Sequence, residues 1–174
     1  MTCGQPDSIL IRPMNANDPQ AITDAEAAQG WHVELEKQLM RWRDQQAGRS
    51  VALVAEYQGR VAGYINVYRQ ALDGPDAFRA LPEIVDFGVF IPFRNHGVGT
   101  RLMDAAEDIA AAWSDTVCLA VGLHSGYGSA QRMYVKRGYV PDGSGVWYQG
   151  RVCGEYDPCC NDDDLVLFLS KKLR

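Results

Sequence analysis

The pattern of apolar and polar residues divides the chain into alternating strand and helix signals. Apolar runs rich in β-branched and aromatic residues predict strands at 8–14, 51–70, 83–91, 116–123 and 165–169, with another around Tyr148. The 51–70 run is interpreted as two strands, because Gln58–Gly59 in its middle is a tight-turn signal. The segment 71–82 contains one glycine and two prolines and is predicted to be a loop.

Helical periodicity appears in four places between these strands. It predicts two helices within 19–47, a long helix from the "RNHG" segment to about Trp113, and a helix at 129–137. In the second helix, an apolar stripe spaced by three and four residues is expected to face inward, and it consists of Leu35, Leu39, Trp42 and Gln46. Gly48 and Gly138 stand where helix ends are expected, and Gly138 is suited to a left-handed cap.

The order of these elements predicts the fold class. One strand, two helices, three strands, a helix, a strand, a helix and two strands follow one another. The strand–helix–strand–helix centre implies a partly parallel sheet. We therefore expect an α/β (α+β) fold with a mixed central sheet of about six to seven strands flanked by helices. A length of 174 residues fits a single domain over 1–174.

Charge and hydropathy exclude some classes of partner. Seventeen basic and 22 acidic side chains give a net charge of −5, which argues against a nucleic-acid binder and mildly favours cationic ligands. Apolar runs stay well short of the roughly 20 residues of a membrane span, and the first residues lack a signal-peptide pattern. We expect a cytoplasmic protein with no membrane partner.

The cysteines do not suggest a disulfide framework or a metal site. They number five, at Cys3, Cys118, Cys153, Cys159 and Cys160, and an odd number does not pair completely. No CxxC pair and no nearby histidine accompany them, so no metal is expected. Cys118 is predicted to be a buried thiol in a strand.

The segment "RNHGVGT", residues 94–100, lies between a predicted strand and a predicted helix. Gly97 and Gly99 allow a ligand to approach the backbone closely. The first N–H groups of a helix have no intrahelical partners and lie at the positive end of the dipole, which suits a phosphate group. Arg94 adds donors for the same anion. Neither a Walker loop nor a dinucleotide fingerprint is matched, and two glycines alone are equally consistent with a plain tight turn.

A second pattern, 30 residues further on, makes the first one specific. Arg94, Gly97 and Gly99 match Q/R-x-x-G-x-G/A, and a second motif of the form A-x-x-x-Y-x-K-x-G-F/Y is matched by Ala130, Tyr134, Lys136, Gly138 and Tyr139. With this spacing and element order, nearly the whole chain resembles the GNAT superfamily of acyl-CoA-dependent N-acetyltransferases. The resemblance implies acetyl-CoA as the acyl donor and a splay between the fourth and fifth strands that admits it.

The resemblance also implies which residues bind the donor. The diphosphate is expected on the segment after the fourth strand, consisting of Arg94, Asn95, His96, Gly97, Val98, Gly99 and Thr100. The pantetheine arm is expected to pair with the backbone of Val89 and Phe87, as an added strand does. Ala130 belongs to the second motif. Tyr127 occupies the position where the family commonly has an asparagine, which puts that contact in doubt.

Candidate catalytic residues follow from the same resemblance. Tyr134 corresponds to the general acid that protonates the departing thiolate, and the Val89 N–H to the donor that polarises the thioester carbonyl. Glu83 and Asp86 rank equally as the base. By strand alternation Glu83 shares the face of Phe87 and Val89, whereas Asp86 points to the other face. A packing role for the tyrosine and ion pairs for the carboxylates remain the alternatives, and His124 is a further candidate for proton relay.

The acceptor is predicted only as a class. Aromatic and acidic residues in 141–164, namely Trp147, Tyr148, Tyr156 and Asp162 to Asp164, would suit an amine such as an aminoglycoside, a polyamine or a peptide amine. A surface loop with solvated acids explains them equally well. The function predicted is an acyltransferase that moves acetyl from acetyl-CoA to a primary amine. The alternatives are a non-catalytic acyl-CoA-binding regulatory module and an ATP-binding protein. Many members of the superfamily form homodimers, so a homodimer is possible, but the sequence does not indicate which surface would form the interface.

Overall fold

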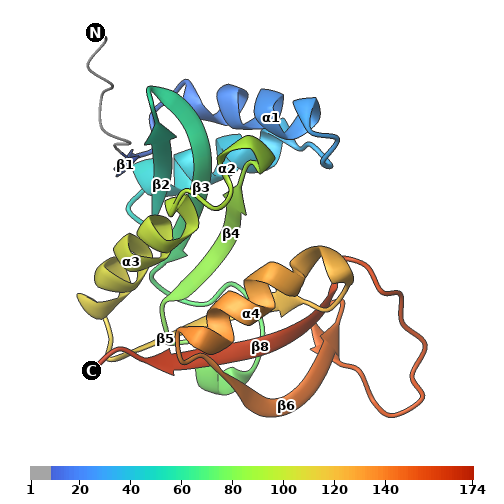
Figure 1. The fold of residues 1–174 in the computed structure, drawn as a ribbon. Coiled ribbons are helices and arrows are strands. Elements are labelled where there is room, and N and C mark those ends of the chain that lie inside the picture. Colours follow the sequence, from blue (N-terminus) through green and yellow to red (C-terminus); the bar gives the residue numbers. More distant parts are fainter. Residues whose placement is uncertain (1–8) are drawn as a thin grey trace, which may run out of the picture. The chain divides into compact units, whose positions relative to one another are not determined.

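A computed structural model describes residues 9–174, so Ser8 of the first predicted strand and Cys3 lie outside the described part. The described chain contains eight strands and four α-helices in the order β1 (Ile9–Pro13), α1 (Asp18–Ala28), α2 (Leu35–Gln46), β2 (Ser50–Tyr57), β3 (Arg60–Tyr68), β4 (Glu83–Val89), α3 (Val98–Ala111), β5 (Thr116–Gly122), α4 (Gly128–Lys136), β6 (Val140–Tyr148), β7 (Arg151–Val152) and β8 (Leu165–Lys172) (Figure 1). Short 3-10 turns at Asp76–Phe78, Ile91–Phe93 and Ser125–Tyr127 complete the described elements.

The predicted α/β order is confirmed, but the number of strands is eight rather than six to seven. The additional strand is β7, a two-residue strand that pairs antiparallel with the end of β6. It forms because Gln149 and Gly150 both have positive φ, 50° and 75°, and so reverse the chain tightly. Two residues are too short to leave a hydrophobic period in the sequence.

The chain folds into two compact units, each of which contains part of β4. Unit one comprises residues 9–67 and 86–109, and its strand order is β1-β2-β3 followed by the second half of β4. Unit two comprises 68–85 and 110–174, and its order is the first half of β4 followed by β5-β8-β6-β7. The parallel ladder of β4 and β5 pairs Glu83 with Cys118 and Ile84 with Leu119, which confirms a partly parallel sheet.

In unit one the β2–β3 hairpin turns where the sequence predicts. Gln58 and Gly59 have φ of 51° and 75°, the left-handed pair that matches the twist of a two-residue hairpin. On β3, a Cβ at Gly63 would contact Leu102 of α3, while the neighbouring Tyr64 contacts Glu26 of α1. Since successive residues of a strand face opposite sides, α3 covers one face of β3 and α1 the other.

The predicted inward stripe of α2 is only partly correct, since Leu39 and Trp42 are half-buried. Leu35 and Gln46 are exposed, and the buried residues of the helix are Gln38 and Arg41. The helix is therefore rotated so that polar side chains face the protein, because their partners lie there: Asp86 binds Arg41, and the next turn carries Gln45 to the backbone of β2. Periodicity identified the helix but not which of its residues are fully buried.

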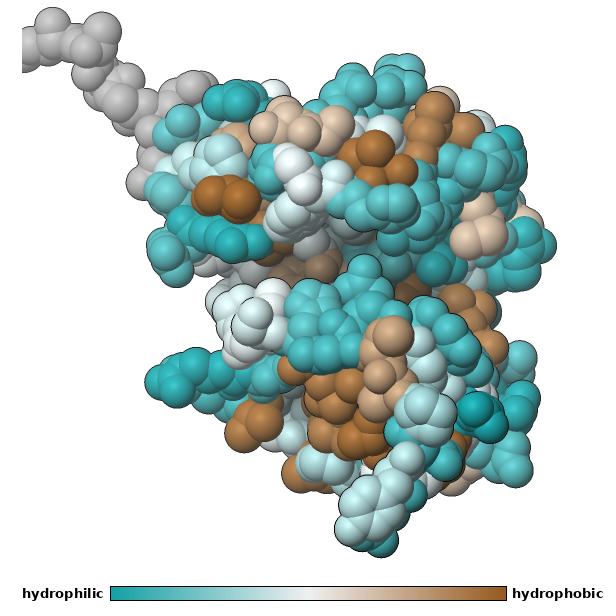
Figure 2. All heavy atoms as spheres, turned by 90° about the vertical axis from the view of Figure 1, so that its right-hand side faces the viewer, coloured by the Kyte–Doolittle hydropathy of each residue, from teal (hydrophilic) through white to brown (hydrophobic). Residues whose placement is uncertain are grey.

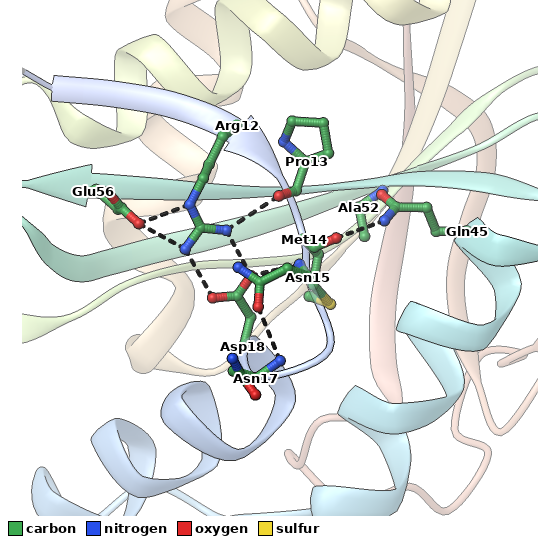
Figure 3. Close-up of polar contacts among 9 residues, drawn as sticks. All are labelled: Arg12, Pro13, Met14, Asn15, Asn17, Asp18, Gln45, Ala52 and Glu56. Atoms are coloured by element: carbon green, nitrogen blue, oxygen red, sulfur yellow. Dashed lines mark hydrogen bonds and ion pairs between the residues drawn. The ribbon is translucent and has the colours of Figure 1, made fainter.

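A polar network connects β1, the first turn of α1 and β2 (Figure 3). Arg12 donates to both oxygens of Asp18, at 2.6 and 2.9 Å, and to Glu56 at 2.7 Å. Gln45 uses both ends of its amide, donating to the Met14 carbonyl at 2.8 Å and accepting from the Ala52 N–H at 2.9 Å. Asp18 is 3% exposed, so its charge depends on Arg12 for compensation.

Unit two is an antiparallel arrangement around β8, which pairs with β5 on one side and β6 on the other. The ladder of β6 is irregular between Pro141 and Val146, where Gly143 and Gly145 have positive φ. This interruption accounts for the strong curvature of β6 in Figure 1. Phe78, Cys118 and Phe168 form a buried cluster beside it, which confirms Cys118 as a buried thiol.

The surface drawn in Figure 2 carries both hydrophilic and hydrophobic groups. The most exposed large apolar side chains, each at least half exposed, are Leu10, Leu72, Ile91, Val135, Val140 and Tyr156. Scattered exposure of this kind is ordinary for folded proteins. Among residues 9–174, none of the helices is both long and apolar enough to span a membrane.

Replacing Arg12 by glutamine tests the network of Figure 3. The change leaves the buried Asp18 carboxylate without its ion pair, and we expect the free energy of unfolding to fall by about 3 kcal/mol. Urea denaturation measures it. The double variant Arg12→Gln/Asp18→Asn should recover much of the loss because no buried charge remains.

Arg79→Gln is the matched control. Arg79 pairs with Asp76 at 2.8 Å, but both side chains are more than half exposed. This variant should change the unfolding free energy by no more than about 0.5 kcal/mol. Equal losses in the two single variants would show that Arg12 acts only as a surface residue.

Candidate functional site

The β4–α3 junction in unit one presents an exposed backbone turn. Residues 94–97 are exposed, and α3 begins directly after them at Val98. The first helical bond is donated by the Arg101 N–H to the Gly97 carbonyl at 3.1 Å, so the N–H groups before Arg101 precede the helical ladder. The described first turn of α3 carries no acidic side chain that would neutralise it. The junction therefore has the donor set that an anion requires.

The two glycines of the junction are needed for different reasons. Gly97 has φ of 84°, a left-handed conformation that side chains with a Cβ rarely adopt, and a Cβ there would meet only Ile9 at 3.8 Å. Gly99 has ordinary φ, but its Cβ would lie 3.2 Å from Phe87 and 3.4 Å from Val89. Gly97 thus permits the turn, and Gly99 permits α3 to pack closely on β4.

Arg94 and His96 hold the turn against the rest of unit one. Arg94 Nε donates to the Val89 carbonyl at 3.3 Å, and its guanidinium lies 5.7 Å from the centre of the Trp31 ring. His96 Nδ1 lies 2.8 Å from the Arg94 carbonyl, and its ring centre is 5.1 Å from that of Tyr57. Asn95 between them has φ of 63°, which asparagine tolerates better than most residues.

Asp86 lies at a bend inside β4. Its φ is 49°, so the extended alternation of the strand is interrupted at this residue. Strand parity therefore does not decide whether Glu83 shares a face with Phe87 and Val89, because the parity rule does not extend across a left-handed residue. The Asp86 carboxylate accepts a hydrogen bond from Arg41 Nε at 2.5 Å and lies 3.5 Å from Lys37 Nζ. Both cations come from α2.

Glu83, at the beginning of β4 in unit two, is almost completely buried at 5% exposure. Its Oε2 accepts from the Leu72 N–H at 2.8 Å and so fixes the loop after β3. Burial, followed by the Glu83 charge, raises the pKa of the neighbouring Cys118 thiol to about 12. This thiol consequently stays protonated.

Tyr134 projects from α4 into the interior of unit two. It is 6% exposed, and its ring centre lies 5.7 Å from that of Tyr139. Burial, with a smaller contribution from Tyr127, raises the pKa of Tyr134 above its usual value of 10. The phenol therefore keeps its proton throughout the neutral range. Ala130 lies in the first turn of the same helix.

A cluster at the end of β5 connects Tyr127 to a distant loop. The Tyr127 ring lies against Gly122, where an added Cβ would be 2.4 Å away. Its hydroxyl and His124 Nε2 both contact Asp163 Oδ1, at 2.9 and 3.0 Å. His124 Nδ1 accepts from the Gly126 N–H at 3.1 Å, so the ring proton is on Nε2 and is donated to Asp163. The acidic run thus fastens the loop to η3 (Ser125–Tyr127), a role the sequence did not indicate.

The structure brings the predicted residues together in two groups. Unit one holds ten of them, from Asp86 to Thr100, and unit two holds Glu83, Tyr127, Ala130 and Tyr134. Within residues 9–174, no cluster of three or more His, Cys, Asp or Glu side chains is arranged to hold a metal ion. The unit-one group includes the exposed backbone turn at the β4–α3 junction, and the unit-two group contains a buried phenol.

Family comparison identifies the class of protein that this fold and these motifs define. The sequence model of the acetyltransferase (GNAT) family matches residues 19–139, which include both motifs. The chain therefore belongs to the GNAT family of acetyltransferases and is an acyltransferase. No curated protein sequence matches the chain significantly.

Solved structures with the same fold cover nearly the whole chain. The structure of yncA from Salmonella typhimurium with its cofactor acetyl-CoA has a TM-score of 0.68 at 19% identity, covering 97% of this chain and 95% of that one. Ribosomal-protein-alanine N-acetyltransferase from Brucella melitensis has a TM-score of 0.66 at 19% identity, covering 94% and 99%. Ard1 from Thermoplasma volcanium has 0.67 at 20%, covering 94% and 97%. At these identities the likeness shows the fold.

Asp163→Ala tests the fastening of the loop. The variant removes the acceptor shared by Tyr127 and His124, and we expect limited proteolysis within 153–164 to become several times faster. The control is Asp164→Ala, which also removes one negative charge, at the neighbouring residue. Equal cleavage rates in the two variants would show that the Asp163 contacts do not restrain the loop.

Proposed function

We propose that this protein transfers the acetyl group of acetyl-CoA to a primary amine by direct attack of the amine on the thioester. The observation that carries the proposal is the exposed β4–α3 junction, with donors at the start of α3 and a left-handed Gly97. Membership of the GNAT family supports it, as does the presence of acetyl-CoA in the yncA structure. The donors and the space at the junction fit a diphosphate.

In this proposal the backbone of His96 to Thr100 binds the diphosphate of the donor. The open space above Gly97 would admit a phosphate oxygen, and Arg94 would turn from the Val89 carbonyl towards the same anion. Val89 and Phe87 would pair with the pantetheine arm through their main chain. The Val89 N–H would donate to the thioester oxygen as negative charge develops there.

Tyr134 would protonate the departing sulfur. A phenol that stays protonated in the neutral range can give its proton to a thiolate when the carbon–sulfur bond breaks. Ala130 and Tyr127 would contact the same arm of the donor. These assignments rest on the second motif and on the burial of Tyr134.

The identity of the base stays open between the two predicted carboxylates. Glu83 is buried and bonded to Leu72, and Asp86 is compensated by Arg41 and Lys37. A carboxylate whose charge is already paired holds an amine proton less readily. These contacts favour structural roles for both side chains and give reason to look for a proton acceptor elsewhere.

The acceptor is proposed as a small-molecule or peptide amine. Two of the similar structures are named for ribosomal-protein-alanine N-acetylation and as Ard1, which makes a peptide amine a reasonable first probe. A cytoplasmic location and a homodimer stay predictions. The alternative is an acyl-CoA-binding module without catalysis, since fold does not fix function.

Thiol release separates the enzyme from the alternative. Purified protein with acetyl-CoA and a panel of amines should liberate coenzyme A in proportion to acetylated amine, measured with a thiol reagent and by mass spectrometry. A protein that binds acetyl-CoA but frees no thiol with any amine would be a binding module.

Tyr134→Phe tests the acid. The variant keeps the ring packed against Tyr139 but cannot donate a proton, and we expect kcat to fall by about 100-fold while KM for acetyl-CoA changes by less than about threefold. Because burial raises the Tyr134 pKa, the wild-type kcat should not decline between pH 7 and 10 through loss of this acid. Unchanged kcat in the variant would remove Tyr134 from the mechanism.

Gly97→Asn tests the diphosphate site without breaking the turn. Asparagine tolerates a left-handed backbone, so the variant should unfold within a few degrees of wild type while its side chain fills the space above residue 97. We expect the dissociation constant for coenzyme A, measured by calorimetry, to rise by about tenfold or more. Gly97→Val is less informative because strain and filling act together. Wild-type affinity in Gly97→Asn would contradict the placement.

A further inference from the structure

A polar cluster lies buried in unit one, on the face of β3 that α1 and α2 cover. Tyr64 of β3 donates its hydroxyl to Glu26 of α1 at 2.5 Å, and both are at most 5% exposed. Gln38 of α2 lies beside the same hydroxyl and is 0% exposed. Burial, and then the Glu26 carboxylate, raise the pKa of Tyr64 well above 10, so the phenol is protonated. Polar groups are seldom buried together unless each is satisfied.

The Gln38 amide makes no hydrogen bond of ordinary geometry. Its oxygen and nitrogen have no partner at hydrogen-bond distance and angle among residues 9–174, although the whole side chain is buried and the amide interacts weakly with the Tyr64 hydroxyl. Asn66, two residues after Tyr64 and so on the same face of β3, is in the same condition. Gln45, about two helical turns after Gln38, forms hydrogen bonds with both ends of its amide. A buried amide without a well-formed hydrogen bond costs stability, so the Gln38 amide has capacity for a further hydrogen-bond partner.

The cluster lies next to the proposed site of reaction. A Cβ placed on Gly88 would be 3.2 Å from the Tyr64 hydroxyl and 3.0 Å from the ring. The phenol therefore lies directly against the residue before Val89, whose N–H is the proposed thioester donor. An amine that attacks from this face of β4 would meet the Tyr64 oxygen.

Of the two carboxylates near Tyr64, Asp86 is paired with cations, and Glu26 is the one that can take up a proton. Lys37 and Arg41 of α2 both face Asp86, and this group carries no excess of negative charge. Among residues 9–174, the Glu26 carboxylate accepts a hydrogen bond from the neutral Tyr64 hydroxyl and forms no ion pair. A proton moved to Glu26 therefore neutralises a carboxylate and breaks no ion pair.

We propose that Tyr64 and Glu26 form the proton acceptor of the reaction, and that the Gln38 amide binds the acceptor amine beside them. The inference rests on the proposed function and adds residues that the motifs do not indicate. It replaces Glu83 and Asp86 with a phenol–carboxylate relay reached from the α1–α2 side of β4.

The proton balance of the step is complete. The alkylammonium, which predominates at pH 7, gives one proton to the Tyr64 oxygen while the Tyr64 proton passes to Glu26. The freed lone pair attacks the carbonyl carbon, the C–N bond forms, the C–S bond breaks, and sulfur keeps the electron pair. The thiolate takes its proton from Tyr134, and the second nitrogen proton, which is lost as the amide forms, restores Tyr134 through solvent. Glu26 returns its proton to solvent.

Tyr64→Phe and Glu26→Gln test the relay. Phenylalanine keeps the ring against Gly88, and glutamine still accepts from Tyr64, so both variants should fold. With the best acceptor among an amino acid amide, a tetrapeptide with a free N-terminus and spermidine, each should lower kcat/KM for the amine by about 100-fold at pH 7. KM for acetyl-CoA should change by less than about threefold.

The pH profile separates a relay from a structural role. As pH rises towards about 10, α-amino acceptors arrive largely deprotonated and alkyl amines increasingly so, and the defect of both variants should therefore shrink towards the wild-type rate. A defect that stays constant from pH 7 to 10, or a wild-type rate at pH 7, overturns the relay.

Gln38→Leu tests the binding of the amine, with Gln45→Leu as its control. We expect Gln38→Leu to raise Tm or leave it unchanged, because an unpaired amide is removed, and to raise the acceptor KM by about tenfold. Gln45→Leu should lower Tm and leave the acceptor KM unchanged. A Tm loss in Gln38→Leu with unchanged acceptor KM would show that the amide is structural.

The wild-type enzyme decides whether the proposed function itself holds. If it transfers acetyl to none of the three probe amines, the proposed function fails and the relay with it. If it transfers acetyl and the three variants behave as wild type, only the relay is wrong.

Discussion

The N–H groups at the beginning of α3 are the feature on which the rest of the site depends. A helix cannot bond its own first donors, and here they follow an exposed turn with no acidic side chain to neutralise them. Gly97 supplies the left-handed backbone that exposes them, and Gly99 lets the helix settle against Phe87 and Val89. Packing and the proposed anion binding therefore set requirements on neighbouring glycines of one short segment. The strand that could carry the thioester donor is the one against which this helix packs.

Unit one also buries polar groups that a purely structural core would avoid. Arg41 and Lys37 compensate Asp86 at its left-handed bend, while Tyr64, Glu26 and Gln38 lie on the same side of the sheet. The contrast within α2 is informative, because the Gln45 amide is bonded at both ends, whereas the Gln38 amide makes no hydrogen bond of ordinary geometry within the described chain. Sequences usually depart from good packing where they serve a ligand.

Local signals in the sequence predicted most of the fold. The Gln58–Gly59 turn, the glycine caps and the two motifs depend on backbone conformations that few residue types adopt, so they are legible without a structure. The inward face of α2 was only partly predicted because its partners, Asp86 and the β2 backbone, are distant in sequence. The face of Glu83 cannot be predicted from strand parity, because the left-handed Asp86 interrupts the alternation. Glu26, Tyr64 and Gln38 form no motif, and their association is visible only once α1, α2 and β3 are packed.

The most direct test of the account is a titration of the ¹⁵N-labelled protein with coenzyme A, followed through its backbone amide resonances. If the start of α3 binds the diphosphate, the N–H signals of Gly97, Val98, Gly99 and Thr100 should show the largest shifts and saturate together with binding measured by calorimetry. Saturable binding that leaves these four signals in place would contradict the account.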